Sequence, residues 1–194
     1  MWHSGLVRAC NALQTSLRTC REPCKTGNMP SIAVCVLQRS DGQRRGVVVM
    51  EEVVEGGRIV GLRFLGTVEG LTPGLHGFHV HESGDLRLGC ASLCAHFNPT
   101  HSQHGGPRSA RRHLGDLGNV FADEHGVARV ALDDPHLRLT GPHGVIGRSL
   151  VVHAQRDDLG RGPGPDSLVT GNSGPRVLCG VIGWGPAAPA SSSS

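Results

Sequence analysis

The sequence predicts an all-β protein, an antiparallel β-sandwich or β-barrel, and three observations support this class. The 194 residues include 29 glycines and 12 prolines but no tyrosine and few other aromatic residues. Short Val/Ile/Leu runs alternate with clusters of turn residues, as in chains built from many short strands. Signals for helix starts and ends are nearly absent. The length suits one domain with tails and is sufficient for a substantial core.

Eight segments carry the strand pattern from residue 31 onward. Each is an apolar run or an alternation of apolar and polar residues, which is typical of strands with at least one buried face. Turn sequences separate several of them, including Ser-Asp-Gly at 40–42, Glu-Gly-Gly at 55–57 and Asp-Glu-His-Gly at 123–126. The predicted strands are 31–38, 46–54, 58–68, 76–82, 116–122, 127–133, 148–153 and 177–183.

Two connections between these strands, 83–115 and 154–175, are too long to be hairpin turns. Long loops in compact β domains usually carry the function rather than the packing. Both loops adjoin strands that contain histidines. We therefore expect the functional site to lie where these two loops meet the sheet.

The histidines are the most informative residues of the chain. His79 and His81 lie two residues apart in a predicted strand, so their side chains project from the same face and can hold one ion together. The next candidate ligands arrive over a short loop rich in Gly and Pro, as a loop folded around a second ion requires. Neutral imidazoles with one carboxylate suit zinc or copper better than calcium or magnesium. The further candidates are His96, His101, His104, His113, Asp116 and His153.

Several motifs make the chain resemble the copper/zinc superoxide dismutases from about residue 31 to residue 184. One motif alone is weak evidence, whereas an ordered set is specific. The resemblance implies an eight-stranded antiparallel Greek-key barrel or sandwich with two long functional loops. It also implies an enzyme that converts superoxide to dioxygen and hydrogen peroxide by Cu(II)/Cu(I) cycling. The motifs are GFHVHESGD at 77–85, HFNP at 96–99, HGGP at 104–107, RHLGDLGNV at 112–120, IGRSLVVHAQRDDLGRG at 146–162 and GNSGPRVLCGVIG at 171–183.

The resemblance also implies a role for individual residues, with His96 as an imidazole shared between two metals. Asp157 would link the two sites from behind, because outer carboxylates of this kind fix the orientation of ligating histidines. Arg176 would attract and orient superoxide, and Cys90 and Cys179 would form a disulfide. The implied ligands are His79, His81, His96 and His153 for copper, and His96, His104, His113 and Asp116 for zinc.

Two departures from the family pattern bear on partners and on substrate attraction. Ser83 stands where dimeric relatives often carry a bulky apolar residue, so we expect a weak homodimer. In the loop 154–175, Pro165, Asp166 and Val169 replace much of the charged set that guides the anion, so steering of superoxide is expected to be weaker. As in the family, a copper chaperone is the expected partner for metal loading.

Two alternatives stand beside the enzyme. A site for zinc alone could be structural and order the loop 83–115, but His153 completes a copper set outside the zinc ligands. A dismutase-like partner-binding module, such as the middle domain of the family's copper chaperone, would be expected to bring an MxCxxC motif and a CxC motif, and the sequence has neither. The remaining histidines, His3, His76, His101, His125, His136 and His143, are expected to be ordinary surface or core residues.

Composition excludes several other classes of partner. The net charge of +3 is mild and the basic residues are scattered, so we expect no nucleic acid. No apolar run approaches the length needed to cross a bilayer, so we expect no membrane span. Seven cysteines are an odd number, and at least one must be unpaired within the chain. Cys94 lies four residues from Cys90 and could compete for its pairing.

The two ends of the chain differ from the middle. Residues 1–29 contain Arg8, Arg18 and Arg21 before any acidic residue, which indicates a transit peptide or a poorly ordered extension. Residues 30–184 are expected to form the dismutase domain. Residues 185–194, rich in Pro, Ala and Ser, are expected to be a disordered tail. We expect a cytoplasmic location, with mitochondrial delivery through the extension as the alternative.

Overall fold

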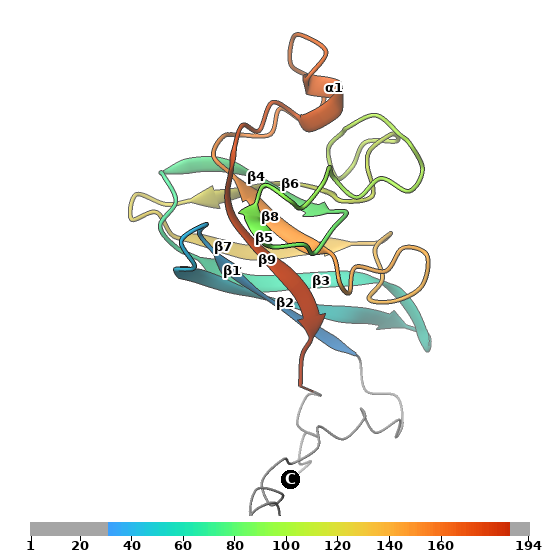
Figure 1. The fold of residues 1–194 in the computed structure, drawn as a ribbon. Helices are drawn as coiled ribbons and strands as arrows, with labels where there is room; N and C mark the ends of the chain where they lie inside the picture. The colour runs from blue at the N-terminus through green and yellow to red at the C-terminus, as the bar shows by residue number, and fades with distance from the viewer. Residues whose placement is uncertain (1–30, 187–194) are drawn as a thin grey trace, which may run out of the picture.

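The computed structural model describes residues 31–186, so the predicted extension 1–29 and most of the predicted tail lie outside the described residues. The described part contains nine strands and one short helix, and most of the strands form a single sheet (Figure 1). The elements are β1 (Ile32–Gln38), β2 (Arg44–Glu55), β3 (Arg58–Val68), β4 (Gly74–His81), β5 (Arg87–Cys90), β6 (Asp116–Ala122), β7 (Ala128–Asp134), β8 (Ser149–His153), α1 (Ser167–Thr170) and β9 (Arg176–Trp184).

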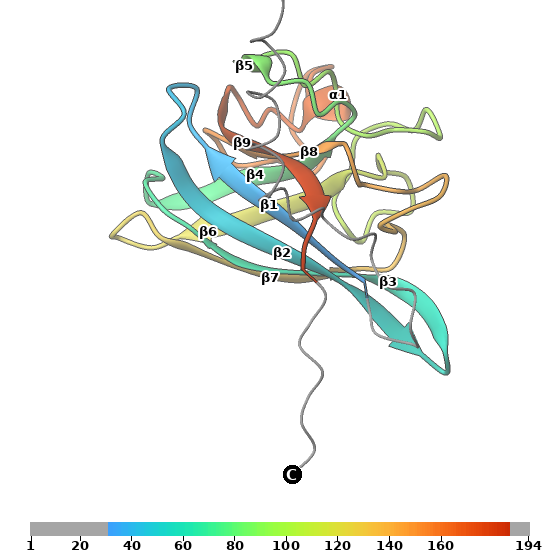
Figure 2. The same ribbon diagram turned by 60° about the horizontal axis from the view of Figure 1, so that its bottom comes forward.

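Eight strands close into an antiparallel barrel in the order β1-β2-β3-β7-β6-β4-β8-β9 (Figure 2). Strand β3 pairs with β7 rather than with β4, and β4 lies between β6 and β8. The chain therefore crosses the barrel between β3 and β4, which gives the Greek-key arrangement. Pairing of β1 with β9, where Val34 lies opposite Gly183, closes the barrel and removes its edges. The predicted fold class is confirmed.

Alternation of side chains fills the barrel interior. In β1, Ala33, Cys35 and Leu37 are fully buried, while the residues between them are partly exposed. Phe64 of β3 and Phe78 of β4 are among the largest fully buried side chains, and burial of each stabilises the fold by roughly 1.5–3 kcal/mol. Strands β4 and β8 differ from the others because they are buried along nearly their whole length. Their outward-facing side chains are covered by the long loops.

The eight predicted strands are the eight strands of the barrel, and none of their ends is shifted by more than two residues. Two elements were not predicted, and both lie inside the long loops. Strand β5 is mostly exposed and joins none of the barrel's ladders, so it lacks the burial that produces a strand pattern. Helix α1 has four residues, too few for helical periodicity. Within residues 31–186, no helix has the length and apolarity to cross a membrane.

The two long loops meet on one side of the barrel. The first connects the end of β4 to the start of β6, and the second connects the end of β8 to the start of β9. Because β4 and β8 are antiparallel neighbours, with His81 opposite Ser149, the two loops leave this pair of strands at opposite ends and fold back over its outer side. The backbone N–H of His104 in the first loop donates to the carbonyl of Leu168 in the second at 2.8 Å. The loops are thus joined over the histidine-bearing strands.

Candidate metal centre

Four histidine side chains converge on the outer side of β4 and β8. Their candidate ligand nitrogens all lie within 4.8 Å of one another, and all four residues are buried. Nε2 of His81 lies 3.3 Å from Nε2 of His153, so these two atoms face a common point. We call this group the first set, and its members are His79, His81, His96 and His153.

Hydrogen bonds fix the tautomers of the three rings that the strands contribute. In each ring one nitrogen donates its N–H to an oxygen, which leaves the lone pair of the other nitrogen directed into the set. The tautomer is thereby suited to metal binding before any ion arrives. The pairs are His79 Nε2 with Asp157 Oδ2 at 2.8 Å, His81 Nδ1 with the Cys94 carbonyl at 3.0 Å and His153 Nδ1 with the Gly174 carbonyl at 2.9 Å.

A second set lies beside the first and shares His96 with it; its members are His96, His104, His113 and Asp116. Oδ1 of Asp116 lies 3.0 Å from Nδ1 of His96 and 3.2 Å from Nδ1 of His113. With Nδ1 of His96 in the second set, its Nε2 is left for the first set. The rings of His79 and His96 are 4.0 Å apart between centroids. The geometry therefore provides two ion sites with one imidazole in common.

Two observations test whether these residues fit metal ions. Nδ1 of His79 and Nδ1 of His104 are buried without a hydrogen-bond partner, although the latter lies 3.0 Å from Asp116 Oδ2 in an unsuitable orientation. Buried polar atoms without partners are rare in folded proteins. Tetrahedral zinc, with Zn–N bonds of about 2.0–2.1 Å, places donor atoms about 3.3 Å apart. Nδ1 of His113 lies 3.4 Å from Nδ1 of His96. Both sets fit a metal.

The electrostatics of the two sets differ. Burial lowers the pKa of His79 to about 3 and that of His153 to about 4, so both imidazoles are neutral, as metal ligation requires. Burial opposes protonation of His104 too, but the nearby carboxylate of Asp116 and the hydrogen bond to Asp157 outweigh it and raise its pKa to about 9. In the absence of metal a protonated His104 therefore offsets part of the negative charge of the carboxylates around the second set. A cation bound there displaces the proton.

Asp157 connects the two sets from behind. Its Oδ2 accepts from His79 and its Oδ1 from His104, each at 2.8 Å. Burial alone would raise the pKa of Asp157, but these bonds prevail and lower it to about 2, so the carboxylate stays ionised. Gly171 packs against this link with φ of 67°, and a Cβ there would come within 2.0 Å of Asp157 Oδ1. Glycine is therefore required at this position.

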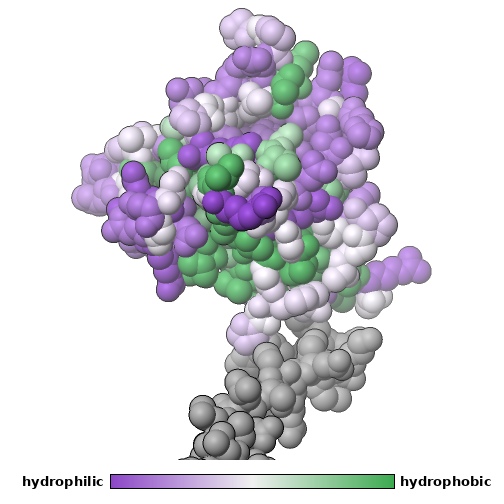
Figure 3. Space-filling view, in the orientation of Figure 1, coloured by the Kyte–Doolittle hydropathy of each residue, from purple (hydrophilic) through white to green (hydrophobic). Residues whose placement is uncertain are grey.

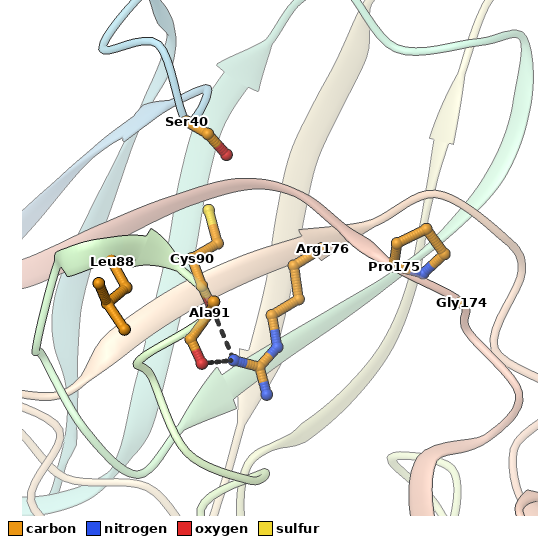
Figure 4. A pocket seen from close by; sticks show the side chains of 7 residues that line it. All are labelled: Ser40, Leu88, Cys90, Ala91, Gly174, Pro175 and Arg176. Carbon is orange, nitrogen blue, oxygen red and sulfur yellow. Dashed lines mark hydrogen bonds between the residues drawn. The ribbon is translucent and has the colours of Figure 1, made fainter.

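Arg176 begins β9 and pairs with His153 across the sheet. Its Nη1 donates to the Cys90 carbonyl at 2.7 Å, and its Nη2 donates to the Cys94 carbonyl. The Cys94 carbonyl also accepts from His81, so one oxygen joins Arg176 to the first set. Figure 4 shows the guanidinium beside the chain at Cys90 and Ala91, at a solvent-open hollow of about 330 Å³. The hollow is lined by Ser40, Leu88, Cys90, Ala91, Gly174, Pro175 and Arg176.

Cys90 and Cys179 form a disulfide that bridges 89 residues, with their Cα atoms 5.8 Å apart. Cys90 ends β5 in the first long loop and Cys179 lies in β9, so the bond ties the loop to the barrel. Two further cysteines in the described residues are free. Cys94 is exposed, whereas burial raises the pKa of the Cys35 thiol to about 12 and makes it unreactive. The N-terminal cysteines lie outside the described residues.

We predict that peptide mapping of the mature protein without reduction finds Cys90 joined to Cys179 and Cys94 open to alkylation. Closing so long a loop stabilises the fold by roughly 4 kcal/mol in the chain-entropy description, so Cys179→Ser should lower the unfolding free energy by about that amount. Cys35→Ser is unsuitable as a control because Cys35 is fully buried. Cys94→Ser is the matched control and should leave stability unchanged. A peptide that joins Cys90 to Cys94 would overturn this pairing.

The structure brings all the expected ligands together and leaves the other described histidines outside both sets, while His3 lies outside the described residues. His101 is exposed and belongs to neither set. His76 is buried, with Nδ1 2.8 Å from the His153 carbonyl and Nε2 2.7 Å from the Thr72 carbonyl, so it supports the backbone of a set member. Sequence reasoning did not identify the carbonyls of Cys94 and Gly174 as partners of the histidines. A backbone acceptor leaves no signal in residue identity.

A closed Greek-key barrel that carries two adjoining ion sites with a shared histidine defines a binuclear metalloprotein. The family model for copper/zinc superoxide dismutase matches residues 44–182. The chain is 51% identical to copper/zinc superoxide dismutase A of Xenopus laevis over 79% of its length and 98% of the relative's. It is 45% identical to an extracellular copper/zinc superoxide dismutase of Brugia pahangi, over 81% of this chain and 78% of the relative.

A solved structure agrees with these relatives. The crystal structure of the clock protein EA4 superposes with a TM-score of 0.73 at 47% identity, covering 81% of this chain and 97% of that one. The chain belongs to the copper/zinc superoxide dismutase family. It is an oxidoreductase that acts on superoxide, with copper and zinc as cofactors, and these predictions are confirmed. The alternative of a dismutase-like partner-binding module is not favoured, since the relatives of this chain are named as the enzyme itself.

The prediction of a cytoplasmic location, with a mitochondrial alternative, is wrong. The relative from Brugia pahangi is named an extracellular superoxide dismutase, as is another from Onchocerca volvulus that is 49% identical over 81% of this chain. Only the mitochondrial alternative rested on the composition of residues 1–29, and the residues that form the barrel carry no signal for a compartment.

Proposed function

We propose that copper is held by His79, His81, His96 and His153, and zinc by His96, His104, His113 and Asp116. The observation that carries the proposal is the sharing of His96 between two buried sets whose remaining donor atoms are directed inward. The first set offers nitrogen alone, which suits copper. The second includes one carboxylate, and three histidines with one carboxylate give the closed, four-ligand arrangement that zinc prefers.

The protein's own groups supply the steps around the metals. Bound copper supplies one-electron redox chemistry, whereas zinc has none. His96 holds both sites in place with its two nitrogens. Its Nε2, on the side of the first set, would hold oxidised copper, and it would carry a proton for the peroxide product only while it is free of the metal. His79 and His104 are kept in orientation by Asp157, so the distance between the two sites stays fixed through the reaction.

Arg176 binds the substrate in this proposal. Its carbonyl contacts hold the guanidinium beside the first set, and no carboxylate among the described residues forms an ion pair with it. Partial burial lowers its pKa somewhat, yet a guanidinium stays charged at any physiological pH. A fixed positive charge at an open hollow attracts a small anion and orients it by hydrogen bonds. Helix α1 presents the exposed apolar residues Leu168 and Val169, which contribute no charge that could guide the anion.

Metal analysis of the purified protein, run beside an assay of superoxide removal, tests the proposed function. We expect copper and zinc in equal amounts, and superoxide removal that cyanide inhibits because it competes at copper. Zinc without copper, or removal that cyanide leaves intact, would contradict the proposal. Copper and zinc present without activity would revive the partner-binding alternative.

We further propose that residues 30–184 form the dismutase domain, flanked by an extension and a tail, and that the enzyme acts outside the cell. The strands from Ile32 to Trp184 and the family match at 44–182 support these limits. An extracellular location is supported by the names of the relatives and suits a disulfide, which persists in oxidising surroundings. A copper chaperone remains the proposed source of the copper.

A weak homodimer is the proposed assembly. Figure 3 shows hydrophobic residues gathered on the lower half of the face that carries β9. Val36, Val181 and Trp184 are 42%, 37% and 54% exposed and form an apolar surface across β1 and β9. Ser83 adds nothing to it, because its hydroxyl accepts from the Asp85 N–H at 3.0 Å within its own loop. An interface with one large anchor and no apolar partner at Ser83 is expected to be weak.

Sedimentation across a concentration series measures this assembly. We predict a shift from monomer to dimer as concentration rises, and for Trp184→Ser a shift to the monomer at all concentrations. Phe121→Ser is the matched control, since Phe121 is 63% exposed on β6, away from β1 and β9 in the barrel order, and should leave assembly unchanged. A monomer at every concentration of the unmodified protein would exclude the dimer.

A further inference from the structure

We propose that Asn119 is a positioning residue that fixes Asp157 and, through it, the geometry of both metal sites. The inference rests on the proposed ligand assignment and concerns a residue that touches neither set. Asn119 lies in β6, whereas Asp157 lies in the second long loop, 38 residues further along the chain. The contact between them joins the rigid barrel to the loop that links the sites.

The amide of Asn119 makes two opposed hydrogen bonds with the backbone of Asp157. Its Nδ2 donates to the Asp157 carbonyl at 2.9 Å, and its Oδ1 accepts from the Asp157 N–H at 2.7 Å. Because one side chain satisfies both backbone groups of one residue, it fixes the position and the direction of the chain there. The Asp157 side chain is then free to accept from the two histidines. Asn119 thus replaces the strand partner that a loop residue lacks.

The strand register explains why this side chain sits where it can do so. Asn119 follows Asp116 by three residues in β6 and pairs with Gly77 of β4, two residues before His79. The ladder between β4 and β6 shifts register between Gly77 and His79. One short piece of sheet therefore carries a member of each set together with the amide that holds the link between them. Positions set by strands are more precise than positions set by loops.

Displacement of Asp157 affects both sets at once. Its two carboxylate oxygens each hold a histidine at 2.8 Å, one in each set. Oδ1 also accepts from the Leu159 N–H at 2.7 Å, which turns the following chain back toward the barrel. If the backbone of Asp157 drifts, both rings lose their orienting acceptor together. Loss of Asn119 should therefore weaken copper and zinc binding in parallel, unlike loss of a ligand that belongs to one set.

The test compares metal affinities in a double-mutant cycle, measured by chelator competition on the disulfide-bonded protein. Asn119→Ala should lower both affinities by about tenfold or more, in line with losses at groups behind metal ligands. Asp157→Ala should lower both as well. If Asn119 acts through Asp157, the double variant should bind the metals no more weakly than Asp157→Ala alone. The absorption and paramagnetic resonance spectra of bound Cu(II) should shift identically in the two single variants.

A matched control separates positioning from general stability. Ser167 lies in the same loop, is fully buried, and donates to the neighbouring Asp158 at 2.8 Å rather than to Asp157. Ser167→Ala should lower the melting temperature of the metal-free protein without changing either affinity. Equal losses of affinity in Ser167→Ala and Asn119→Ala would overturn the proposal, as would a double variant that binds more weakly than Asp157→Ala.

Asn119→Asp keeps the shape of the side chain and serves if Asn119→Ala does not fold. It retains the acceptor for the Asp157 N–H but faces the Asp157 carbonyl with an oxygen in place of a donor. The added negative charge would by itself raise cation affinity, so a parallel fall for both metals supports displacement, and an increase contradicts it. Failure of the ligand assignment is recognised separately, because His153→Ala would then leave copper bound in protein with an intact Asn119.

Discussion

His153→Ala is expected to abolish superoxide dismutation while zinc remains bound. His153 belongs to the first set alone, and its Nε2 lies 3.3 Å from Nε2 of His81. Removing one of four nitrogens from the copper site lowers copper affinity and leaves that side open to water. None of the second set contacts the His153 side chain by a hydrogen bond, so zinc keeps its ligands. Metal analysis after dialysis, together with the rate of superoxide removal, measures both effects.

His101→Ala is the control for that experiment. His101 lies between two members of the second set in the sequence, but it is exposed and belongs to neither set. Its replacement should leave metal content and activity unchanged. Near-normal activity in His153→Ala would mean that the copper site is assigned to the wrong residues. Loss of activity in both variants would mean that the assay responds to any histidine near the loop.

The strands and the pairing of His79 with His81 were predictable because both depend on local sequence, whereas the division of the ligands into two sets was implied by the family resemblance. A period of two residues marks each barrel strand, and the same period places His79 and His81 on one face of β4. The long loops were recognised by their length. The elements inside these loops were not predicted. Strand β5 is held by the disulfide at Cys90 and joins no ladder of the barrel, so its sequence shows no pattern of burial that would indicate a strand.

Contacts between distant segments set the remaining features of the site. The carbonyls of Cys94 and Gly174, which orient two histidines, become acceptors only when the loops fold over the sheet. The same holds for Asn119, whose partner lies in another loop. Such contacts are determined by tertiary packing, and residue type gives little warning of them. The compartment was mispredicted for a different reason, since the packing of residues 31–186 carries no signal for it.

Asp116→Ala is expected to lower thermal stability more than any other single change in the second set. Asp116 is fully buried, and its Oδ2 accepts from the backbone N–H groups of Gly105 at 3.0 Å and His113 at 2.8 Å. The variant therefore loses a zinc ligand and also the bonds that fold the first long loop. Burial favours the neutral acid, but the adjacent imidazoles of His104, His113 and His96 hold the pKa of Asp116 far below its usual range. Asp116→Ala therefore also removes a negative charge that would attract zinc.

Zinc binding contributes directly to folding, since the unfolded chain has no comparable site. Each tenfold loss of zinc affinity removes about 1.4 kcal/mol of stabilisation at saturating metal, so the melting temperature of Asp116→Ala should fall well below that of His153→Ala. Copper affinity should fall less than zinc affinity, because His96 keeps its place in the first set. Calorimetry of both variants, with and without a zinc chelator, makes the comparison. If chelation leaves the melting temperature of the unmodified protein unchanged, zinc does not organise the loop, and the second set needs another explanation.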